Sequence, residues 1–142
     1  MTGTDDSTAP QPETMYDLEL HTADGVTTMQ RCARALADAG TNIDAVNYSG
    51  VNGSRTLHLL VQDGLGAVEI LAGGVVDEVT CRPVLVYTLP NRPGTLARYS
   101  RALVDDDVAI DFIYQATAKG VVIAAPDLDA VRASFAAAAS RS

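Results

Sequence analysis

The stretch Leu89-Pro90-Asn91-Arg92-Pro93-Gly94-Thr95-Leu96 joins two segments with different hydrophobic patterns. Before it, the apolar and β-rich run 84–87 predicts a strand. After it, apolar or part-apolar side chains recur at close to the 3.6-residue spacing of an amphipathic helix, namely Leu96, Tyr99, Leu103 and Val104. We therefore predict a strand, a tight loop and a helix.

Pro93 and Gly94 give this loop features of a binding turn. Pro93 has no N–H and a fixed φ, so it suits the first turn of a helix, where that donor has no partner. Gly94 has no Cβ and lets another group approach the backbone. The N–H groups of such a turn, at the positive end of a helix dipole, favour a carboxylate. From the loop alone, an ordinary strand-to-helix connection is the alternative.

Composition limits the class of protein. The chain has 142 residues, 47% of them hydrophobic, which is enough for one compact domain or two very small ones that share a core. The formal net charge is −8 and no Lys/Arg cluster is present, so we expect no nucleic-acid or membrane partner. No apolar run is long enough to span a bilayer and the start has no leader pattern, so we expect a soluble, cytoplasmic protein.

Residue types that carry chemistry are few. Cys32 and Cys81 fall in a helical and a strand pattern, which favours buried reduced thiols. His21 and His58 both fall in strand patterns and have no metal-ligand spacing. No nucleophile–base arrangement can be named from the sequence, so we predict no metal site, no cofactor and no enzymatic activity.

From its start, the sequence predicts a flexible tail (1–14) followed by a βαββαβ unit. Its strands are expected at 16–21, 43–48, 57–61 and 75–81, with a turn at 49–54. One helix has Val26, Met29, Cys32, Ala33 and Leu36 on one face and ends at Gly40, and the other spans 64–72 after an Asp63 cap. This order describes a four-stranded antiparallel sheet with both helices on one face, the ferredoxin-like arrangement.

The pattern then starts again. At a constant offset of 67, Arg34-Ala35-Leu36 meets Arg101-Ala102-Leu103, and Ile43-Asp44 meets Ile110-Asp111. After the hairpin the offset shrinks, so the second copy has lost three or four residues near its turn at 118–120. Its last helix starts near Asp127 and no fourth strand follows, which leaves a sheet edge for another chain to cover. We predict an α+β fold of two tandem βαββαβ modules, the second without its last strand.

A strand followed by Asn-x-Pro-Gly-Thr-Leu, a helix and a strand containing Ala109-Ile110-Asp111 resembles the ACT domain family. The resemblance covers residues 16–138. The two copies in so short a chain are similar to small stand-alone proteins made of two ACT domains. It implies module boundaries at 15–82 and 83–142. In the first copy, Val26 and Thr27 replace the Pro-Gly pair, so the second-copy loop is expected to be the better-formed site.

The resemblance implies a small ligand, most often an amino acid, bound between the first loop of one module and the second strand of a neighbouring one. The residues implied are Asn91, Arg92, Pro93, Gly94, Thr95 and Leu96, with Asn42, Ile43 and Asp44 or Ala109, Ile110 and Asp111 facing them. Asp24 and Gly25 are the first-copy loop positions.

Physical chemistry suggests a role for each group. Backbone N–H groups near Gly94 and Thr95 would hold an α-carboxylate, and Asn91 would bond the polar head. Asp111 or Asp44 would pair with an α-ammonium, while Arg92 is either a carboxylate partner or a solvated loop residue.

We therefore expect a non-catalytic regulatory or sensor protein that binds an amino acid and forms a homo-oligomer. The alternatives are a structural dimerisation module without ligand and a small enzyme on a ferredoxin-like sheet.

Overall fold

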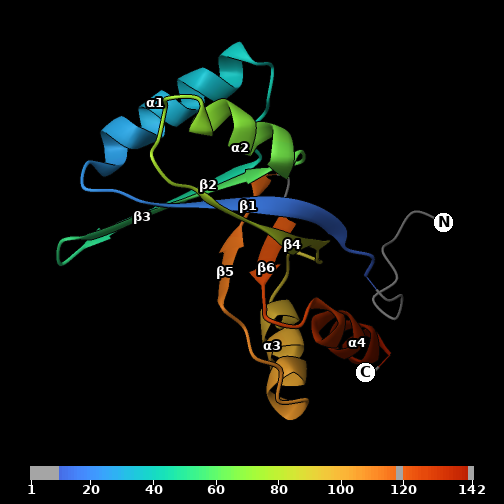
Figure 1. The fold of residues 1–142 in the computed structure, drawn as a ribbon. Helices are drawn as coiled ribbons and strands as arrows, with labels where there is room; N and C mark the ends of the chain where they lie inside the picture. The colour runs from blue at the N-terminus through green and yellow to red at the C-terminus, as the bar shows by residue number, and fades with distance from the viewer. Residues whose placement is uncertain (1–9, 118–119, 141–142) are drawn as a thin grey trace. The chain divides into compact units, whose positions relative to one another are not determined.

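The computed structural model describes residues 10–117 and 120–140 of the chain (Figure 1). They form two compact units, which are Thr14–Val84 and the described residues from Leu85 onward together with 10–13. The elements follow the order βαββαβαββα and are β1 (Glu13–His21), α1 (Gly25–Asp38), β2 (Ala45–Val51), β3 (Ser54–Val61), α2 (Gly64–Ala72), β4 (Thr80–Thr88), α3 (Thr95–Asp105), β5 (Phe112–Gln115), β6 (Gly120–Ala124) and α4 (Leu128–Ala139).

The first unit has the ferredoxin-like strand order β2-β3-β1-β4. Both helices lie on the same side of these strands in Figure 1. The apolar faces of β1 and β3 pack against them, and the buried core includes Leu18, Leu20, Cys32, Leu36, Leu57, Leu59 and Leu71. Side chains alternate along β1, so Leu18 and Leu20 face this core. Met15 and Asp17 on the other face are buried as well, so the strand has more than one buried face.

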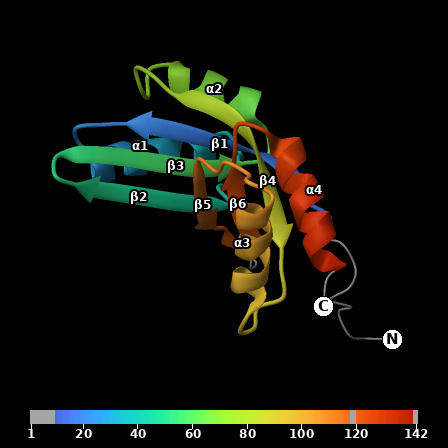
Figure 2. The same cartoon turned by 90° about the horizontal axis from the view of Figure 1, so that it is seen from below.

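The second unit has the strand order β4-β6-β5, and Figure 2 shows the short strands β5 and β6 beside β4. Phe135 of α4 is central to its core, because its ring lies 4.5 Å from the Tyr87 ring and 4.8 Å from the Tyr99 ring. No strand follows α4 among the described residues, and β4 has β1 on one side and β6 on the other, so the prediction that a missing last strand leaves an open sheet edge beside it is wrong.

Strand β4 replaces two predicted strands. The predictions of separate strands at 75–81 and 84–87 are wrong, because Thr80–Thr88 is one continuous strand. Val75, Val76 and Val79 instead pack against the first core from an irregular segment, which explains their apolar character without a strand. Thus β4 stands where the first module needs its last strand and the second its first.

The two hairpins are paired in equivalent registers. Ala45 lies opposite Leu60 in the first unit, and Phe112 lies opposite Ala124 in the second. Phe112 lies 67 residues after Ala45, and Ala124 lies 64 residues after Leu60. Asp63 and Asp127 occupy matching positions before α2 and α4, and each carboxylate accepts a bond from the backbone N–H three residues on. The offsets counted in the sequence therefore match equivalent positions in space.

Other expectations need correction. The first hairpin turns at Asn52 and Gly53, both with positive φ, and β2 extends to Val51, beyond the predicted strand end. The second-copy turn falls partly on residues 118 and 119, outside the described part, as do residues 1–9 of the predicted tail, while β1 already begins at Glu13. No helix among the described residues is long and apolar enough to cross a membrane.

Candidate functional site

The loop after β4 differs in detail from its prediction. Helix α3 begins at Thr95, and Gly94 precedes it with φ of +93° as the N-cap residue. Pro93 was predicted in the first helical turn but lies in the turn before the helix. A Cβ on Gly94 would meet nothing within 4 Å, so glycine is required there by the left-handed backbone.

This turn determines which backbone donors are available. The Arg92 N–H bonds to the Pro90 carbonyl at 3.1 Å, and the Thr95 N–H bonds to the Arg92 carbonyl at 3.3 Å. The predicted use of Thr95 as a carboxylate donor therefore competes with a bond inside the turn. Among the described residues, the N–H groups of Leu96 and Ala97 donate no hydrogen bond, and the N-cap residue Gly94 has no side chain to accept one. These two groups are the open donors at the positive end of α3.

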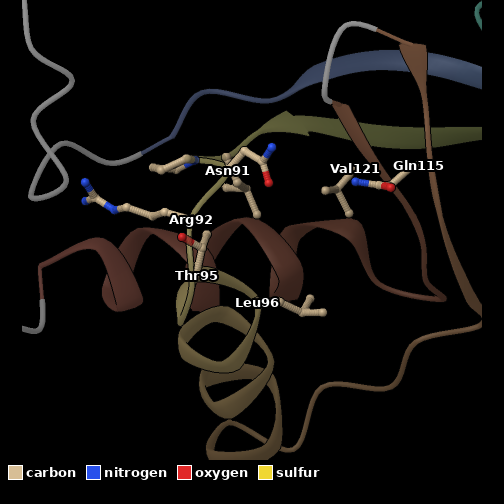
Figure 3. A pocket seen from close by; sticks show the side chains of 8 residues that line it. Asn91, Arg92, Thr95, Leu96, Gln115 and Val121 are labelled. Atoms are coloured by element: carbon tan, nitrogen blue, oxygen red, sulfur yellow. The ribbon is translucent and has the colours of Figure 1, made fainter.

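A cavity of about 130 Å³ lies beside this end of α3 (Figure 3). Its lining comes from the loop, the first turn of α3 and the paired ends of β5 and β6, namely Leu89, Pro90, Asn91, Arg92, Thr95, Leu96, Gln115 and Val121. In Figure 3 the Arg92 side chain extends away from Gln115 and Val121. The remaining side chains provide two carboxamides, one hydroxyl and an apolar wall.

Leu96 forms part of that wall although its side chain is 68% exposed. Leu96 and Val104 belong to the apolar spacing that predicted this helix, but both side chains are exposed, and Tyr99, Ala102 and Leu103 form the buried face. A large apolar side chain that is exposed beside a cavity is available to a ligand.

The structure separates the predicted site residues into groups. Asn91, Arg92, Thr95 and Leu96 line the cavity, whereas Pro93 and Gly94 shape the turn behind it. Ala109, Ile110 and Asp111 precede β5 and do not line this cavity. Asn42 and Asp44 line a different cavity of about 300 Å³ in the first unit, where the Asn42 amide donates to Asp44 at 2.9 Å. Ile43 packs against the first core, and Asp24 and Gly25 begin α1.

Sequence reasoning missed Gln115 and Val121. They lie directly opposite each other across β5 and β6. Their signal was present in the repeat, because Gln115 stands 67 residues after Tyr48 and Val121 stands 64 after Leu57, which are also a cross-strand pair. Extending the repeat through the hairpin would have placed both beside the loop.

In the first unit, Tyr48 takes the position that corresponds to Gln115. Helix α1 begins at Gly25, three positions earlier than α3 begins when the copies are aligned, and both helices end at matching residues. A Cβ on Gly25 would lie 2.1–2.4 Å from atoms of the Tyr48 ring. The ring therefore packs directly onto the start of α1, in the position that corresponds to Gln115.

A larger cavity of about 370 Å³ lies at the first loop, where Thr22 and Thr28 correspond to Leu89 and Thr95 of the smaller cavity. Its lining includes Thr22, Thr28 and Arg31, and residues 74–78, which follow α2. The Thr22 and Thr28 hydroxyls bond to each other at 2.8 Å, so they are partly satisfied. Cavity volume alone therefore does not favour the second-copy loop over the first-copy loop as the binding site.

Arg98 anchors the start of α3. Its guanidinium donates to the Ala138 carbonyl at 3.0 and 3.2 Å and to the Ala139 carbonyl at 3.0 Å. A cation at the last carbonyls of α4 satisfies acceptors that otherwise have no helical partner. This contact connects the helix that carries the cavity to the last helix of the same unit.

The ionisable groups of the two cores are held neutral. Burial raises the pKa of Tyr87 to about 12. Burial also raises the pKa of the Cys32 and Cys81 thiols above their ordinary value, which disfavours the reactive thiolate. Neither cysteine therefore has the environment of an activated nucleophile.

Comparison with solved structures identifies the class of fold first. It is an ACT-like fold, shared with regulatory subunits of aspartate kinase. The regulatory subunit from Thermus thermophilus superposes with a TM-score of 0.66 at 17% identity, covering 92% of this chain and 99% of that one. The regulatory subunit from Thermus flavus gives 0.63 at 19% identity, covering 92% and 95%.

A protein from Bacteroides thetaiotaomicron is similar over a greater length. Its TM-score is 0.72 at 19% identity, and the alignment covers 95% of this chain and 100% of that chain. No family model and no curated protein matches the sequence. At these identities the likeness establishes the fold alone.

Proposed function

We propose that this protein is a non-catalytic regulatory or sensor protein that binds a small amino acid in the cavity at the start of α3. The observation that carries the proposal is the cavity of about 130 Å³ next to the open N–H groups of Leu96 and Ala97. Cavities for drug-sized ligands are about 300–1,000 Å³, so this volume favours a much smaller molecule.

Each part of an amino acid has a complementary group there. The N–H groups of Leu96 and Ala97 face a carboxylate with the help of the helix dipole. The side-chain oxygens of Asn91 and Gln115 accept from an α-ammonium, the role that the sequence analysis gave to Asp111 or Asp44. Leu96 and Val121 contact the ligand side chain. Two proteins of similar structure are regulatory subunits of aspartate kinase, which supports a regulatory role.

A thermal-shift screen of the twenty amino acids tests this proposal. Binding at a hundredfold excess over Kd stabilises the folded state by about 2.7 kcal/mol, which corresponds to a rise of several degrees in Tm. We expect one or a few small amino acids to produce this rise. If none of the twenty does so, the proposed ligand class is wrong.

Replacement of Gly94 localises the response. Gly94→Val forces a β-branched residue into a left-handed backbone, which distorts the turn beside the cavity. Gly53→Val is the matched control, because Gly53 also has positive φ and open space around it but lies in the first hairpin. We expect both variants to lose similar stability and only Gly94→Val to lose the ligand response. An equal response in both variants would place the site elsewhere.

We also propose that the protein forms a homo-oligomer through the strand at an end of the sheet. Strand β2 is such an edge, and its side chains Val46 and Val51 are exposed. Exposed apolar edge strands tend to pair with another chain. Sedimentation should show a dimer or larger species that dissociates in Val46→Lys, and a monomeric wild type at high concentration would contradict the proposal.

A further inference from the structure

Two carboxylates and a histidine cluster on the first unit's sheet, on the face opposite its helices. Asp17 and Glu19 alternate along β1 with Leu18 and Leu20, which pack in the core toward α1 and α2. His58 of β3 lies directly opposite Glu19. Their potential ligand atoms, one from each side chain, all lie within 4.8 Å of one another.

The contacts within the cluster are directional. The Nδ1 of His58 lies 3.0 and 3.2 Å from the two Asp17 carboxylate oxygens, and its Nε2 lies 3.7 Å from Glu19 Oε1. The other Glu19 oxygen accepts from His21 Nε2 at 2.8 Å. Both imidazoles thus direct Nε2 at the same carboxylate.

A metal ion fits this arrangement chemically. A metal-bound histidine usually donates its second ring N–H to a carboxylate, and Asp17 stands in that position behind His58. With Nδ1–H donating to Asp17, Nε2 presents a lone pair toward Glu19. Zinc binds imidazole nitrogen and carboxylate oxygen at about 2.0–2.2 Å, so ligand atoms on one ion lie at most about 4.4 Å apart. The distances of 3.7 Å from His58 Nε2 to Glu19 and 2.8 Å from His21 Nε2 to Glu19 are within this limit.

The electrostatics of the cluster favour a cation. Asp17 is fully buried, and the His58 side chain is only 12% exposed. The Asp17 and Glu19 carboxylates lie 3.0 and 3.7 Å from the His58 ring nitrogens, so a cation held there meets two negative charges at short range. His21 lies at the exposed margin, where an ion can enter.

The second unit shows that the fold does not need these polar groups. The positions equivalent to Asp17, Glu19 and His58 are Val84, Val86 and Val122. Val86 lies opposite Val122 as Glu19 lies opposite His58. Buried charge clusters can often be replaced by apolar residues without loss of stability. Because three valines occupy these positions in the second copy, folding alone does not explain why the first copy has Asp17, Glu19 and His58 there.

We propose that His58 Nε2 and the Glu19 carboxylate bind a divalent transition metal of the zinc class, with His21 as a third ligand from the margin. Asp17 orients His58 from behind, and water completes the coordination. This site is separate from the cavity at α3, and neither proposal depends on the other.

Titration of the chelator-treated full chain with Zn²⁺ tests the site. We expect one Zn²⁺ per chain by calorimetry and a rise in Tm with added metal. The triple variant Asp17→Val, Glu19→Val, His58→Val copies the second unit, and we expect it to fold and to lose at least a hundredfold in affinity. His21→Ala should lose roughly tenfold, within the range of ligand-shell changes. His58→Gln gives the same readout as the triple variant if the latter fails to fold.

Cys81→Ala is the control for binding to a thiol and should retain wild-type affinity. Because the chain has only two histidines, nitrogen NMR can follow His58 directly. We expect its Nε2 signal to shift with one equivalent of Zn²⁺. Absence of Zn²⁺ binding, an unchanged affinity in the valine or glutamine variant, or an unshifted His58 signal would each overturn the proposal.

Discussion

The loops that lead into α1 and α3 occupy corresponding positions in the sequence repeat but have different structures. Before α1 the chain enters the helix at Gly25, and the Tyr48 ring packs onto that glycine. Before α3 the left-handed Gly94 delays the helix, and Gln115 occupies the Tyr48 position. One side chain and one turn therefore account for the different surroundings of the two helix starts. The comparison shows that corresponding loops can place their cavities differently, because the first-unit cavity lies beside Thr22 and Thr28 rather than beside Tyr48.

The largest effect is expected from replacing Gln115 with tyrosine, the residue at the corresponding position in the first unit. Gln115→Tyr places an aromatic ring in the cavity of about 130 Å³, and we expect at least a hundredfold loss of amino-acid affinity by calorimetry. This corresponds to about 2.7 kcal/mol. Gln30→Tyr on the exposed surface of α1 is the control and should bind normally. Wild-type affinity in Gln115→Tyr would mean that the ligand does not use this cavity.

The second-largest effect is expected from loss of the Arg98 contact that anchors α3. Arg98→Met removes the charged donor from the Ala138 and Ala139 carbonyls, and we expect the free energy of unfolding to fall by about 1.5–3 kcal/mol. Arg101→Met breaks only an exposed pair with Asp105 and should cost at most about 0.5 kcal/mol. Urea denaturation measures both values, and equal losses would show that the Arg98 contact is not structural.

The cores also differ at one equivalent position, where Leu20 in the first unit corresponds to Tyr87 in the second. Because the folded-state pKa of Tyr87 is raised to about 12, its stabilising contribution is complete below pH 10 and is lost as pH rises toward 12. We expect a loss of about 1.4 kcal/mol per pH unit in that range. Tyr87→Phe should remove this slope, and an unchanged slope would assign it to other groups.

Local sequence signals predicted the elements whose causes are local. The Asp63 and Asp127 caps, the end of α1 before Gly40 and the βαββαβ order depend on neighbouring residues and were predicted correctly. Strand β4 was divided in the prediction because apolar residues such as Val75 also occur in packed irregular segments.

The candidate site was only half predicted, because it combines a loop with a hairpin. Asn91 and Leu96 follow from the local motif, whereas Gln115 and Val121 depend on cross-strand register. The same limit applied to His58, whose partners Asp17 and Glu19 lie about forty residues earlier on a paired strand. Hydrophobic periodicity does not report which polar side chains meet across a sheet.

The most direct measurement is an amide NMR titration of the full chain with the amino acid that gives the greatest thermal shift. We predict that the backbone N–H signals of Leu96 and Ala97 move most, together with the side-chain amides of Asn91 and Gln115. Signals around Thr28 and Arg31 in the first unit should stay in place. Saturable shifts confined to the first unit, with Leu96 and Ala97 unchanged, would contradict the account.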